Sequence, residues 1–195
     1  MRVTEIVRQR GLIRNLVLAT AVFCASLVLG AFRGQNIVEG LLSELGAVLE
    51  PLASTGNLSL LLLLVIFINN AIKALVLILL GILLGLPSIL FIGLNAFILG
   101  GLGSALESVN GWRYALASFV AHGVIEIPVV LLATALSLTV GMESARWLIR
   151  KESRVKSWLS DGLKVYVRWI LPGLAIAAVI EVFVTPLLVG PFSTG

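Results

Sequence analysis

The sequence has few charged residues for its length. Asp, Glu, Lys and Arg make up 12% of its 195 residues, hydrophobic residues make up 59%, and the mean hydropathy is +1.10. Soluble domains carry roughly a quarter charged residues, so this chain could not cover a water-exposed surface. A water-soluble fold is therefore excluded, and lipid is the expected solvent for most of the chain.

Cysteine and histidine are almost absent. Cys24 is the only cysteine, which excludes an internal disulfide and a multi-cysteine metal site. A mixed metal site could be built only from His122, Glu126 and Glu181, and this pattern is too weak to predict a metal or any cofactor. The HExxH, GxSxG and Walker A motifs are missing, so we expect no enzymatic activity.

Long apolar runs predict an all-α, polytopic transmembrane helical bundle with about five spans. A crossing takes about 20 residues at about 1.5 Å each, so the apolar stretch after residue 57 should cross twice, with a turn at Leu86-Pro87-Ser88. The first run follows several arginines, as in a signal peptide, but it lacks a small-x-small cleavage pattern, so we keep it as a span. The expected spans are Leu16–Phe32, Leu58–Leu86, Ser88–Leu106, Trp112–Val140 and Val165–Val189.

We expect one membrane domain over residues 1–195. Residues 1–57 would hold the first span and an amphipathic helix, and residues 58–190 would hold a core of four spans. Basic residues gather in the N-terminal segment and in the Gly141–Lys164 connection, which places the N-terminus inside and the C-terminus outside. The sequence therefore predicts a multi-pass protein of the cell (plasma) membrane, with the lipid bilayer as its first partner.

Two segments outside the expected spans are amphipathic. Asn36–Leu52 places apolar residues at helical spacing and acidic residues on the other face, which predicts a helix in the outer interface. The basic Gly141–Lys164 connection includes Trp147 and Trp158, which predicts a cytoplasmic interfacial helix anchored on anionic lipid. Nothing beyond this charge favours nucleic acid, so we expect no nucleic-acid partner.

Several polar residues fall inside the expected spans. A charged side chain at the bilayer centre costs roughly 2.5 to 3.5 kcal/mol on insertion scales, so such groups should face one another or a wet cavity. Glu181 lies nearer the outer end of its span, where its carboxylate could instead reach the headgroups. The predicted intramembrane polar or ion site consists of Asn69, Asn70, Lys73, Asn95, His122, Glu126 and Glu181.

The spacing of these residues indicates two similar pairs of spans. His122 and Glu126 are four residues apart, as are Asn69 and Lys73, so each pair shares one helix face. The same offset separates the two pairs, and both helices would run from outside to inside, which predicts similar depths in the membrane. Paired interruptions in corresponding segments are how transporters build a central site.

The chemistry of this cluster has two alternatives. Lys73 and Glu126 could neutralise each other, which would make the site structural. Alternatively, Glu126 is protonated at pH 7 because leaving water disfavours its charged form, and it titrates as the conformation changes, with His122 relaying protons. Glycines should also matter for packing, because small residues let helices approach closely within a subunit or across a homodimer. They are Gly81, Gly85, Gly93, Gly100, Gly101 and Gly103.

Short motifs between Leu58 and Leu188 are shared with one known family. They are Phe67-Ile68-Asn69-Asn70, Gly81–Gly85 with Leu86-Pro87, Asn95 before Gly100, His122-Gly123-x-x-Glu126 and Ile180-Glu181-Val182-Phe183. Together they resemble the stage II sporulation protein M family, with one departure at Ala96, where glycine is expected. The family's namesake is a membrane scaffold that organises cell-wall-degrading enzymes during engulfment, and relatives occur in organisms that never sporulate.

Two functions remain as alternatives. In the first, the polar cluster conducts or transports a proton, ion or small solute, which requires a wet cavity. In the second, the resemblance implies a non-catalytic scaffold that organises partner membrane or extracytoplasmic proteins. The cluster would then be dry and would only hold helices together.

Overall fold

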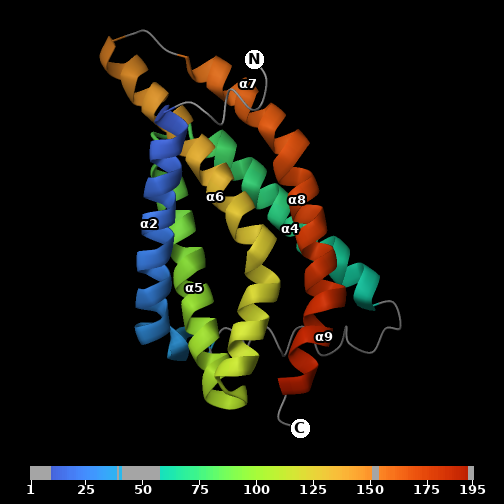
Figure 1. Ribbon diagram of the computed structural model, residues 1–195. Helices are drawn as coiled ribbons and strands as arrows, with labels where there is room; N and C mark the ends of the chain where they lie inside the picture. Colours follow the sequence, from blue (N-terminus) through green and yellow to red (C-terminus); the bar gives the residue numbers. More distant parts are fainter. Residues whose placement is uncertain (1–9, 39, 41–57, 151–153, 193–195) are drawn as a thin grey trace.

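The computed structural model describes residues 10–38, 40, 58–150 and 154–192 (Figure 1). Within this part of the chain, five helical segments are long and apolar enough to cross a membrane. The all-helical fold with five spans is therefore confirmed. The segments are α2 (Arg10–Arg33), α4 (Leu58–Leu80), α5 (Leu86–Asn110), α6 (Trp112–Arg150) and a final series that begins with α7 (Val155–Val165).

Successive spans alternate in direction, and α6 lies at the centre (Figure 1). The helix α6 contacts α2, α4, α5 and every long segment of the final series. Its candidate span is 56% buried, whereas no other span exceeds 28%, so α6 is the shared core of the bundle. The helices α4 and α6 run the same way, as predicted, and which end faces the cytoplasm stays a prediction.

Close backbone contacts join α2 to α5. A Cβ atom on Gly100 would overlap the carbonyl oxygen of Leu27, and a Cβ atom on Gly30 would overlap the carbonyl oxygen of Phe97. Only glycine permits this approach, which maximises van der Waals contact where lipid supplies no hydrophobic drive for helix association.

The Gly81–Gly85 pair also packs within the chain. A Cβ atom on Gly81 would lie 2.6 Å from the carbonyl oxygen of Ser137, and one on Gly141 would overlap the backbone of Gly85. These glycines therefore join the α4–α5 turn to α6. Homodimerisation stays a prediction that this pair does not support.

The turn between α4 and α5 lies earlier than predicted. The expected turn at Leu86-Pro87-Ser88 is wrong, because α4 ends at Leu80, residues 81–85 form the turn and α5 begins at Leu86. Leu84 and Gly85 adopt left-handed backbone angles with φ of 60° and 71°. Pro87 lies in the first turn of α5, where its missing N–H is not needed, so this proline starts a helix instead of centring a turn.

The basic connection does not form a single interfacial helix. The central helix α6 continues past the predicted end at Val140 to Arg150, and α7 follows from Val155. Trp158, Asp161 and Val165 of α7 are buried against the bundle, so packing on the core replaces the predicted anchoring of the whole segment on lipid. The predicted outer helix Asn36–Leu52 lies largely outside the described residues, and only its start, residues 35–38 and 40, is seen as helix.

The last span contains two π-helical turns that the sequence reasoning did not anticipate. After α7 come η1 (Tyr166–Ile170), α8 (Leu171–Val179), η2 (Ile180–Val184), α9 (Thr185–Val189) and η3 (Gly190–Phe192). Each π turn is followed at once by a segment with proline in its first turn, and proline cannot donate a backbone hydrogen bond. Widening the turn before the proline keeps the span continuous, and π turns of this kind are frequent at functional sites.

The close approach of α2 and α5 gives a matched test on one helix. We expect Gly100→Ala to lower the free energy of unfolding by about 1–3 kcal/mol, because the added methyl group overlaps Leu27. Gly103→Ala is the control, because nothing lies within 4 Å of its added Cβ. It should leave stability unchanged or raise it by up to about 1 kcal/mol through helix propensity. Thermal unfolding in detergent measures both, and equal losses would contradict this packing.

Candidate functional site

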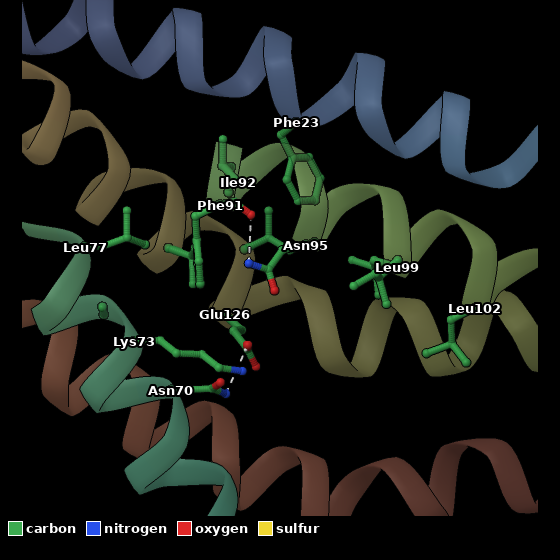
Figure 2. A pocket seen from close by; sticks show the side chains of 14 residues that line it. Phe23, Asn70, Lys73, Leu77, Phe91, Ile92, Asn95, Leu99, Leu102 and Glu126 are labelled. Atoms are coloured by element: carbon green, nitrogen blue, oxygen red, sulfur yellow. Dashed lines mark hydrogen bonds between the residues drawn. The ribbon is translucent and has the colours of Figure 1, made fainter. Parts of the chain in front are cut away.

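The central helix α6 places Glu126 against the side of α4. The Asn70 amide Nδ2 donates to Glu126 Oε1 over 3.0 Å, and the pair is partly buried. Lys73 lies three residues further along α4, on the same face, and both side chains point toward Glu126 (Figure 2). The two spans therefore meet at the same depth, as the spacing predicted.

The residue that bonds Glu126 is Asn70, and the neighbouring Asn69 is exposed on another face of α4. The four-residue spacing had paired Asn69 with Lys73. Since successive helical residues point about 100° apart, only one of two adjacent asparagines can face α6. This detail depends on how α4 is rotated, which the sequence does not give.

A cavity of about 210 Å³ opens beside this pair (Figure 2). Its polar lining residues come from three helices and gather around Glu126. Its other walls are apolar. The lining residues are Phe23, Asn70, Lys73, Ala74, Leu77, Phe91, Ile92, Asn95, Ile98, Leu99, Leu102, Glu126, Ile127 and Val130.

Asn95 brings a third helix to the cavity. Its Nδ2 donates to the carbonyl oxygen of Phe91, 2.9 Å away on the preceding turn of α5. This bond fixes the amide and leaves its oxygen on the cavity side (Figure 2). The cavity thus offers a carboxylate, an ammonium and amide groups on one wall, and apolar side chains elsewhere.

A tightly packed layer closes the cavity toward the α4–α5 turn. Ser137 Oγ lies 2.5 Å from Ser88 Oγ and donates to the carbonyl oxygen of Leu77 over 2.6 Å, and both serines are buried. The glycine contacts of the turn lie in the same layer. By contrast, α4 and α5 make few contacts with each other beyond it. The cavity therefore extends along α5 toward the Asn110 end.

Two predicted site residues are not part of the cavity lining. Glu181 lies on η2, which contacts α4 and α6, but Glu181 does not line the cavity. His122 lies on α6 one turn before Glu126, and its side chain is outside the described part of the structure. No group of three or more His, Cys, Asp and Glu that could hold a metal ion occurs among the described residues.

Other buried polar contacts were missed by the sequence reasoning. The Tyr166 hydroxyl donates to the carbonyl oxygen of Ala71 over 3.0 Å, one residue after Asn70. Asn15 Nδ2 donates to Thr139 Oγ1 over 2.9 Å, which joins α2 to α6. A tyrosine or asparagine at a span end ordinarily marks the interface, so neither residue carried a signal of burial.

The adjacent asparagines provide a matched pair of variants. We expect Asn70→Leu to lower the free energy of unfolding by about 0.6–2 kcal/mol, because it removes the hydrogen bond to Glu126 inside the membrane. Asn69→Leu should be neutral or stabilising, since its exposed side chain would face lipid. Unfolding of both variants in lipid–detergent mixtures measures the difference. A reversed order would mean that α4 is rotated relative to this arrangement.

Comparison with known proteins places the chain in a family. The sequence matches the family model described as Stage II sporulation protein M over residues 19–186. No curated protein and no solved structure matches the chain. The match begins within α2, earlier than the resemblance noted from Leu58, so the first span is part of the family region. This multi-span membrane protein therefore belongs to the Stage II sporulation protein M family.

Proposed function

We propose that this protein moves a proton, an ion or a small solute across the membrane, and that the cavity between α4, α5 and α6 is its binding site. The observation that supports the proposal is the gathering of Asn70, Lys73, Asn95 and Glu126 on one wall of a cavity inside the spans. Ionisable groups within spans are costly, and they typically mark substrate or ion pathways.

The size and lining of the cavity suit a small polar ligand. Its volume of about 210 Å³ exceeds the roughly 150 Å³ of an engineered apolar cavity that binds benzene, so several waters or one small solute would fit. Lys73 and Glu126 carry opposite formal charges, so the site could receive either an anion or a cation by exchanging one internal contact for a ligand contact. The apolar walls would hold the remainder of the solute.

The packing also suits access from one side at a time. The serine and glycine layer closes the cavity toward the α4–α5 turn, while α5 extends it toward Asn110. The polar contacts join α4 to α6, so a shift of α4 would change both the layer and the Asn70–Glu126 bond. Transporters alternate access by such rigid movements around a midplane site.

A scaffold is the second candidate. Membership in the Stage II sporulation protein M family favours it, and the Asn70–Glu126 hydrogen bond would then serve only to hold two helices together. Both candidates are binding functions without a chemical step, in keeping with the expectation that the chain is not an enzyme. They differ in whether Glu126 is needed for flux.

Flux measurements on reconstituted protein separate the two candidates. In proteoliposomes under pH and potassium gradients, we expect the native chain to carry proton or cation flux and Glu126→Gln to abolish it. Glu107→Gln is the control, because Glu107 is exposed near the end of α5 and away from the cavity. Absence of flux in the native chain, together with a lower unfolding temperature for Glu126→Gln, would favour the scaffold.

One-sided access can be measured with cysteine labelling. Cys24 is the only cysteine, so a Cys24→Ser background leaves no other thiol. We expect Leu99→Cys to react with a membrane-impermeant thiol reagent added at the Asn110 end, because Leu99 lines the cavity. Leu94→Cys should stay unreactive, since Leu94 is exposed on the outside of the same span, where lipid suppresses the thiolate. Labelling of Leu99→Cys only from the opposite end would contradict the arrangement.

A further inference from the structure

A second pocket, of about 410 Å³, lies at the end of the bundle where α2 begins. Three helices supply its charged lining: Arg14 comes from α2, Arg146 from α6 and Arg154 from the residue before α7. Glu143 lines the same pocket. The pocket lies beyond the serine and glycine layer and shares no lining residue with the cavity around Glu126.

Positive charge exceeds negative charge among the described residues of this pocket. Glu143 is buried and pairs with the guanidinium of Arg146, which offsets one of the three cations. Arg14 donates to the sulfur of Met142 over 2.7 Å, and a thioether is a weak acceptor. Each guanidinium has five N–H donors, so most of the donors on Arg14 and Arg154 remain available to a ligand.

The walls of the pocket hold these arginines close together. Trp158 of α7 is 8% exposed and forms one wall. The buried Asn15–Thr139 hydrogen bond fixes α2 against α6, directly beside Arg14. Three guanidiniums brought together by such contacts repel one another, and an anion bound among them would remove that repulsion.

We propose that this arginine pocket binds a phosphate group, carried either by an anionic lipid headgroup or by a soluble phosphate compound. The planar guanidinium matches phosphate oxygens bidentately, which favours arginine over lysine for phosphate recognition. The pocket lies at the end of the spans predicted to face the cytoplasm, at headgroup depth. A phosphate here would connect α2, α6 and α7.

The test measures binding by the full chain in detergent, using native mass spectrometry. The probes are phosphatidylglycerol, phosphatidylcholine and inorganic phosphate. We expect the native chain to retain phosphatidylglycerol or inorganic phosphate, and the Arg14→Gln and Arg154→Gln variants to bind about tenfold more weakly, since each loses a charge-assisted contact. Arg113→Gln is the control, because Arg113 packs on Trp112 at the opposite end of α6.

A fourth variant distinguishes a binding role from a purely structural one. Glu143→Gln keeps a hydrogen-bonding side chain but removes the internal counter-charge of Arg146, so we expect it to bind the same probe several-fold more tightly. Retention of phosphatidylglycerol that phosphate does not compete with would assign the site to lipid, and competition by phosphate would assign it to a soluble ligand. Equal binding by the native chain, Arg154→Gln and Arg113→Gln would overturn the proposal, as would equal retention of phosphatidylcholine and phosphatidylglycerol with no binding of phosphate.

Discussion

The hydrogen bond between Asn70 and Glu126 determines how α4 meets the central helix. A carboxylate within the spans has no bulk water to solvate it, so it must find donors on neighbouring helices. Asn70 is one such donor, and the next turn of α4 brings Lys73 to the same face (Figure 2). With α4 fixed in this rotation, Ala71 and Leu77 accept hydrogen bonds from Tyr166 and Ser137.

These contacts divide the bundle into a tight part and a more open part. Near the α4–α5 turn, glycines and serines bring backbones into direct contact, and only small side chains fit between them. Toward the other end, α4 leaves α5 while both stay on α6, and the polar cavity occupies the space between them. The same central helix thus supports a rigid layer and a binding space. That combination is suited to access from one side of the membrane.

Much of the fold was predictable because lipid imposes simple rules on sequence. Run length gave five spans, and the equal spacing of polar residues in two spans predicted that Lys73 and Glu126 lie at similar depth. The Asn-Asn and His-Gly-x-x-Glu motifs pointed to the family that the comparison confirms. The choice of Asn70 over Asn69 was not predictable, because helix rotation is set by packing across the whole interface.

The remaining differences have local causes. Pro87 was taken as the centre of a turn, although proline is equally at home in the first turn of a helix. The extension of α6 to Arg150 escaped prediction because amphipathic sequence after a span suits either an interfacial helix or a continued one. The π turns before Pro172 and Pro186 depend on how each proline is accommodated, and hydropathy carries no trace of that choice.

The central claim is that the wall around Glu126 faces a wet cavity that opens at one end. Infrared difference spectroscopy of the chain in liposomes tests it most directly, with Glu126→Gln identifying the bands of this one carboxyl group. The account predicts that the Glu126 band changes with the pH of the buffer at the Asn110 end and not with the pH at the opposite end. A Glu126 band that responds to neither buffer would mean a dry cluster, and it would contradict the account.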